Sequence, residues 1–106
     1  MNRQLTMLIV DDMEVERISF AEIFKDEYQI LEAENGKQAM EQLEQQKVHI
    51  VLLDLCMPVM DGFEVIREMK QQDKYADIPI VAKTAIDEKT EVKALEAGAD
   101  EYIFSP

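Results

Sequence analysis

The sequence predicts one α/β domain built on a parallel sheet. Short apolar runs alternate with segments of helical period along the 106 residues, a pattern typical of repeated strand and helix units. Two of these runs end in aspartates: the first leads into Asp11 and Asp12, and residues 48–53 lead into Asp54. Because the carboxyl ends of parallel strands meet at one edge of a sheet, we expect the three carboxylates to gather there. Oxygen ligands of this kind suit a hard divalent cation.

The first half of the chain predicts three strands and two helices. Residues 5–10 form the first strand, the polar residues 29–33 suit an edge strand, and the apolar run 48–53 suits a central strand covered on both faces. The Asn35-Gly36 turn precedes the second helix. Apolar residues at helical spacing mark the two helices. These residues are Val15, Ile18, Ala21 and Phe24 in the first helix, and Ala39, Met40 and Leu43 in the second, which ends near Gln46.

The second half predicts two further helices and two further strands. Asp61 is expected to cap a third helix that turns an apolar face to the sheet. Residues 78–82 form a fourth strand with Pro79 near its start, and residues 100–104 form a fifth. Asp87 opens a fourth helix, which Gly98 closes. The apolar residues of these helices are Val65, Ile66 and Met69 in the third, and Val92 and Leu95 in the fourth.

Composition excludes several classes of protein. Apolar residues make up 47% and charged residues 32% of the chain, as in a soluble globular protein. The formal net charge of -12 argues against direct nucleic-acid binding, which needs clustered Lys and Arg. No apolar run approaches the roughly 20 residues that span a bilayer, and the N-terminus does not read as a signal peptide. One cysteine excludes an intrachain disulfide and fits a cytoplasmic location.

Several separated motifs, taken together, resemble the response-regulator receiver domain of two-component signalling. They are Asp11-Asp12, the Asp54 strand end with Met57-Pro58 and Asp61-Gly62, Thr84-Ala85, and Gly98-Ala99-Asp100. The resemblance covers essentially the whole chain, so residues 1–106 are expected to be one receiver domain. It implies a flavodoxin-like, doubly wound sheet of five parallel strands in the order 2-1-3-4-5.

The residues support phosphoryl transfer to a carboxylate. Asp54 is a competent nucleophile because it is ionised at neutral pH. Two more aspartates and an anionic phosphoryl group make a divalent cation necessary, and Mg²⁺, or Mn²⁺, suits such ligands. The resemblance implies that Asp12 and Asp54 bind the metal directly, Asp11 through water, and Cys56 through its backbone carbonyl. It also implies that Thr84 donates to a phosphoryl oxygen and that Tyr102 rotates with the switch.

The resemblance also implies partners. The phosphoryl donor would be a phosphohistidine of a sensor histidine kinase or phosphotransfer protein. An output domain or a target protein would receive the signal, and a homodimer is possible. On this resemblance, the domain would promote its own phosphorylation and dephosphorylation, but would be a signalling module rather than an enzyme.

The chain departs from the family pattern at two places. Ser105 occupies the position of the usual lysine after the fifth strand, and losing such a charge-assisted hydrogen bond costs on the order of 1.5–3 kcal/mol. Lys83 is not expected to compensate, because strand alternation turns it away from the side of Thr84. The usual fifth helix is also missing after Pro106. This predicts an excerpt of a longer regulator, with a covering second copy or marginal stability as the alternatives.

Other functions are weaker matches. Ser105 favours a phosphorylation-independent receiver that acts as a protein-interaction module. A phosphatase of the haloacid-dehalogenase type would need a second carboxylate where Cys56 stands. A flavin carrier is disfavoured because Asp11 and Asp12 would repel the flavin phosphate. The aspartates could also merely cap helices, but three at adjacent strand ends indicate a site.

Overall fold

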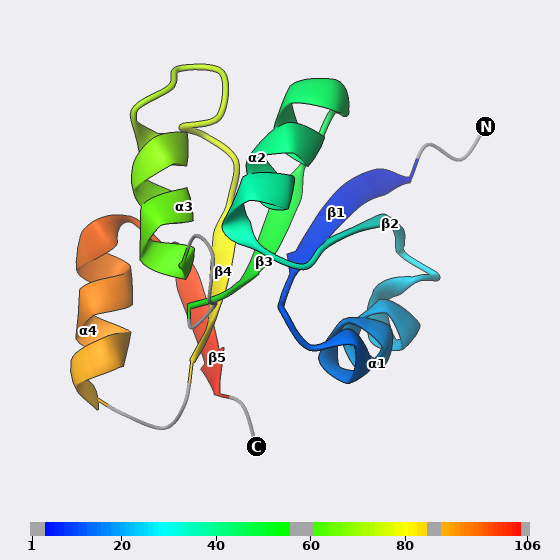
Figure 1. The fold of residues 1–106 in the computed structure, drawn as a ribbon, viewed down its shortest axis with the longest axis horizontal. Coiled ribbons are helices and arrows are strands. Elements are labelled where there is room, and N and C mark those ends of the chain that lie inside the picture. The colour runs from blue at the N-terminus through cyan, green and yellow to red at the C-terminus, as the bar shows by residue number, and fades with distance from the viewer. Residues whose placement is uncertain (1–3, 56–60, 85–87, 105–106) are drawn as a thin grey trace.

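A single parallel sheet organises the protein. The computed structural model describes residues 4–55, 61–84 and 88–104 (Figure 1). All five strands are parallel, in the order β2-β1-β3-β4-β5, which confirms the predicted topology. The strands are β1 (Leu5–Val10), β2 (Tyr28–Ala33), β3 (Ile50–Asp54), β4 (Ile80–Thr84) and β5 (Glu101–Phe104). The helices are α1 (Glu14–Phe24), α2 (Gly36–Gln45), α3 (Gly62–Lys70) and α4 (Glu88–Ala97).

The helices cover the two faces of the sheet unequally (Figure 1). The larger apolar cluster lies between the sheet and α2, α3 and α4, and α3 contributes Val65, Ile66 and Met69, all fully buried. The smaller cluster lies on the other face, where Phe20, Ala21 and Phe24 of α1 pack against β1 and its neighbours. Side chains of the central strands therefore alternate between two apolar layers, as expected of a doubly wound sheet.

Polar caps start two of the helices, and the cap at Asp61 confirms the prediction. The side chain of Asn35 accepts a hydrogen bond from the backbone N–H of Gln38 at 2.8 Å. The side chain of Asp61 accepts one from the backbone N–H of Glu64 at 2.9 Å. These bonds satisfy amide groups that a helix start would otherwise leave unpaired. The cap at Asp61 also places the start of α3 next to the carboxyl end of β3.

The predicted apolar stripe of α1 is wrong in part. The helix forms, but Val15 is 73% exposed and Ile18 is 51% exposed. Residues three apart are separated by about 300° around a helix, so a stripe at that spacing drifts by about 60° at each step. Val15 and Phe24 consequently point in opposite directions, and Phe20 takes the place next to the sheet.

One expectation for the C-terminal half also needs correction. Strand β4 begins at Ile80, two residues later than expected, and Pro79 precedes it while its carbonyl accepts from Val51. In α4, the apolar residues Val92 and Leu95 are exposed, whereas Ala94 is fully buried. A small side chain lets this helix lie close to the sheet. Gly98 has φ of 122°, the left-handed conformation expected of a glycine after a helix.

Candidate functional site

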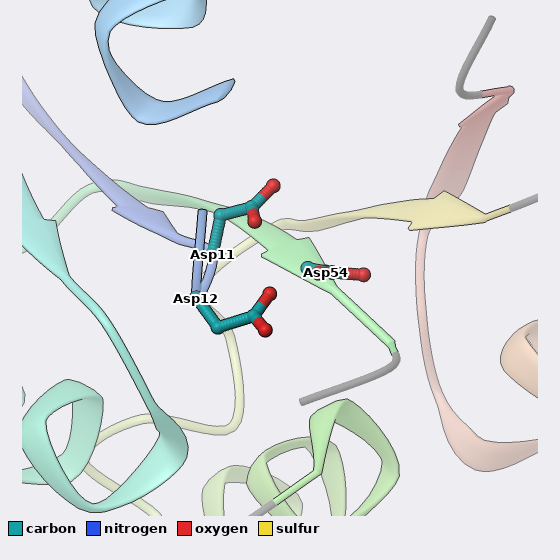
Figure 2. A group of neighbouring side chains, drawn as sticks. All are labelled: Asp11, Asp12 and Asp54. Carbon is teal, nitrogen blue, oxygen red and sulfur yellow. The ribbon is translucent and has the colours of Figure 1, made fainter. Parts of the chain in front are cut away.

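Three carboxylates meet at the carboxyl edge of the sheet. Asp11 and Asp12 follow β1, and Asp54 is the last residue of β3. Each offers a carboxylate oxygen, and these oxygens all lie within 4.8 Å of one another. Figure 2 shows the three side chains extending to the same side. Asp11 is buried, Asp54 is half-buried and Asp12 is exposed, so the cluster opens to solvent on one side.

The structure brings a fourth charged group to this cluster, Lys83 of β4. Its Nζ lies 2.6 Å from Oδ2 of Asp11 and 3.2 Å from Oε2 of Glu16. The Lys83 side chain is only 8% exposed, so its charge is held in place rather than solvated. The reason given for setting Lys83 aside, that its side chain turns away from the site, is therefore wrong.

Strand register explains this error. Lys83 pairs with Asp54 across the parallel β3 and β4 strands, and paired residues of neighbouring strands project to the same face. Ile50, Leu52 and Val81, which precede this pair at alternate positions, all pack on the α1 side. Alternation along β4 could not say which of its side chains stands beside Asp54, but the register places Lys83 in that row.

The surroundings of Lys83 keep its ammonium charged. Burial alone would lower the pKa of Lys83, but hydrogen bonds to Asp11 and Glu16 and the charges of Asp11 and Asp54 outweigh it. The net result is a pKa raised above the ordinary value of 10.5. Opposite charges at short range favour the protonated form in this way. The site thus carries a permanent positive charge at physiological pH.

Asp11 is held by hydrogen bonds at its side chain and its backbone. Its Oδ2 accepts from Lys83, and its Oδ1 accepts from the backbone N–H of Met13 at 3.0 Å. Its backbone carbonyl accepts from Nη1 of Arg17 at 2.8 Å. Both carboxylate oxygens of Asp11 therefore already have donors, which suits a ligand that reaches a metal through water.

The cluster fits a small divalent cation. Metal–oxygen distances of 2.0–2.1 Å put opposite ligands of Mg²⁺ about 4.2 Å apart, close to the 4.8 Å limit that encloses the three carboxylate oxygens. Lys83 supplies one positive charge against these three carboxylates and Glu16. The remaining negative charge favours a cation.

The other expected site residues lie as follows. Thr84 is the last residue of β4, and Tyr102 of β5 is half-buried against the cluster that packs on α2, α3 and α4. Cys56 and Ser105 lie outside the described residues. Sequence reasoning considered Lys83 and set it aside. Its position two residues after Val81, which packs on the α1 side, was a signal that could have placed it in the site.

Comparison with known proteins identifies the family. The profile of the response regulator receiver domain matches residues 7–106. The chemotaxis protein CheY of Halobacterium salinarum is 40% identical over 94% of this chain and 83% of its own length. The phosphate regulon transcriptional regulatory protein PhoB of Pseudomonas aeruginosa is 39% identical over 95% of this chain, which spans only 45% of that protein.

A solved structure agrees with these matches. The signal receiver domain of a signal transduction histidine kinase from Syntrophus aciditrophicus has a TM-score of 0.87 and 31% identity, covering 95% of this chain and 78% of that chain. Within the part of the chain that the structure describes, no helix is both long and apolar enough to cross a membrane. Receiver domains are signalling modules that interact with histidine kinases and output domains. This chain belongs to the family of response regulator receiver domains of two-component systems.

Proposed function

We propose that this receiver domain accepts a phosphoryl group on Asp54, with Mg²⁺ or Mn²⁺ bound at Asp11, Asp12 and Asp54. The observation that carries the proposal is the gathering of the three carboxylate oxygens within 4.8 Å at the sheet edge. Asp54 is half-buried, so a donor can approach it from the open side. The donor would be a phosphohistidine on a sensor histidine kinase or a phosphotransfer protein.

The transfer would proceed by nucleophilic attack. A carboxylate oxygen of Asp54 forms a bond to phosphorus as the phosphorus–nitrogen bond of the donor breaks, and the departing imidazole takes a proton. The bound cation supplies neutralisation of the negative charge that gathers on the phosphoryl oxygens. Asp12, Asp54 and the carbonyl of Cys56 would hold it directly. Asp11 would act through water, in keeping with the two hydrogen bonds that its oxygens accept.

The same proposal extends to the switch and its readers. Thr84 would donate its hydroxyl to a phosphoryl oxygen, and Tyr102, half-buried on β5, would rotate with it. A local charge event would thus bias two conformations. The change would control an output domain or target protein in the cytoplasm, with a homodimer as one possible form.

A second function has one observation in its favour. Ser105 replaces the usual lysine, and a hydroxyl brings no charge to a phosphoryl group. On this alternative, the domain binds partners without being phosphorylated. The two functions differ in whether Asp54 is modified.

Intact-protein mass spectrometry after incubation with acetyl phosphate and Mg²⁺ separates them. We expect one phosphoryl adduct that disappears on chelation and in Asp54→Asn. Asp73→Asn is the matched control, since Asp73 is exposed in the loop between α3 and β4, and it should be phosphorylated like the wild type. The wild type could instead be folded and bind Mg²⁺ without forming an adduct, while Ser105→Lys forms one. That result would support the phosphorylation-independent module.

A further inference from the structure

Building on the proposed phosphoacceptor function, we infer that Lys83 supplies from β4 the positive charge that other receivers take from the lysine after β5. In this chain that position is Ser105. The Lys83 ammonium would bind an oxygen of the phosphoryl group carried by Asp54. Lys83 would thus be a residue of the phosphoryl site and more than a structural partner of Asp11.

Position in the sheet is the first argument. Lys83 and Asp54 are register partners on neighbouring strands, and they continue rows of side chains that project to the α1 side. The Lys83 ammonium and the Asp54 carboxylate therefore lie on the same face of the sheet. It reaches Asp11 at 2.6 Å, and Asp11 and Asp54 belong to one cluster. A phosphoryl group on Asp54 would therefore lie beside this cluster of charged side chains.

Fixation of the charge is the second argument. Lys83 is held by Asp11 and by Glu16 in the first turn of α1, and its Nζ lies 5.8 Å from the ring centre of Phe20. A buried and immobilised cation stabilises developing negative charge without reorganisation at the moment of reaction. The charge of an exposed, flexible lysine would be screened by solvent, so its interaction with a phosphoryl group would be weak.

Donor count is the third argument. A lysine ammonium has three N–H donors, and two are engaged by Asp11 and Glu16 in the described part of the chain. Within those described residues, a third is left for a phosphoryl oxygen. Lys83 can therefore meet the phosphoryl group without leaving Asp11, which would keep the metal site intact during transfer.

Lys83→Gln tests the inference, with Lys74→Gln as the matched control. Lys74 forms an ion pair with Glu44 at 2.9 Å in an exposed position, so the control removes the same charge and also breaks an ion pair. We expect Lys83→Gln to slow phosphoryl uptake from acetyl phosphate on the order of 10- to 100-fold, the value of one charge-assisted hydrogen bond. Lys74→Gln should match the wild type. Lys83→Gln combined with Ser105→Lys should recover most of the rate.

Two binding measurements separate this role from general damage to the site. Beryllofluoride imitates a phosphoryl group on an aspartate, and fluorine NMR measures how tightly the protein binds it. Lys83→Gln should bind beryllofluoride more weakly than the wild type. Mg²⁺ alone should bind Lys83→Gln at least as tightly as wild type in calorimetry, because a repelling charge has gone. Loss of affinity for both, or slow uptake that Ser105→Lys does not recover, would reduce Lys83 to a structural partner and overturn the inference.

Other outcomes remain decisive. Normal uptake and normal beryllofluoride binding by Lys83→Gln would overturn the inference while leaving Asp54 as phosphoacceptor. Absence of both in the wild type would instead overturn the proposed function. If Lys83→Gln does not fold, the side-chain NMR signals of Lys83 in the wild type, with Mg²⁺, decide the matter. They should shift on addition of beryllofluoride while those of Lys74 do not, and an unshifted Lys83 would refute the inference.

Discussion

Replacing Asp12 by asparagine should make the metal-free protein more stable. Carboxylate oxygens of Asp11, Asp12 and Asp54 lie within 4.8 Å of one another, and Lys83 balances Asp11. At that separation, two unit charges repel by about 0.9 kcal/mol in water and by about 3.5 kcal/mol at an effective dielectric constant of about 20. Asp12 is exposed, so the smaller value applies. We expect the free energy of unfolding to rise by about 1 kcal/mol.

With Mg²⁺ bound, the wild type should be more stable than Asp12→Asn. A ligand that binds only the folded state at about ten times its Kd adds about 1.4 kcal/mol of stability. The wild type should gain this amount, whereas Asp12→Asn, which has lost one metal-binding carboxylate, should gain much less. Urea unfolding followed by circular dichroism, once with a chelator and once with Mg²⁺, measures both effects.

The control for this experiment is Asp73→Asn, which removes the same charge from an exposed loop away from the cluster. Its stability should change little under either condition, although the chain carries a net charge of -12. If Asp12→Asn is less stable than the wild type in the chelator, repulsion among the carboxylates is not the dominant effect and the reasoning is refuted. An equal gain in Asp73→Asn would assign the effect to net charge instead.

Three further predictions concern the frame of the site. Gly62→Ala should cost about 1–3 kcal/mol of stability in urea unfolding, because the new Cβ would clash with the carbonyl oxygen of Asp54; unchanged stability would contradict that contact. Asn35→Ala should cost about 1 kcal/mol by losing its cap on α2, and a cost near zero would mean that water replaces the cap. Because the pKa of Lys83 is raised in the folded protein, its charge stabilises the fold below the ordinary value of 10.5 and loses this effect as pH rises through the folded value. The stability difference between wild type and Lys83→Met should therefore be constant near neutral pH and shrink above pH 10.5, and a difference that grows there would show the opposite linkage.

Local patterns were sufficient wherever one helix face or one turn decides the structure. Val65, Ile66 and Met69 are all buried as expected. Met69 follows Val65 by four residues and Ile66 by three, and residues at these two spacings are neighbours on one side of α3. Asp61 caps that helix as expected. The stripe predicted for α1 failed at Val15 because equal spacing of three does not keep residues on one face. For α4, the sequence offered Val92 and Leu95 as the most apolar residues, and packing against the sheet selected the smaller Ala94.

The sequence by itself determined the strand order expected from the family and the arrival of Asp11, Asp12 and Asp54 at one sheet edge, since each aspartate directly follows or ends an apolar strand. Only the tertiary structure decided that Lys83 belongs to the same site. Alternation along a strand determines relative directions within that strand. The pairing of Asp54 with Lys83 depends on the register between β3 and β4. The packing of both sheet faces sets that register. The contact of the Lys83 ammonium with Asp11 at 2.6 Å is therefore a property of the whole sheet.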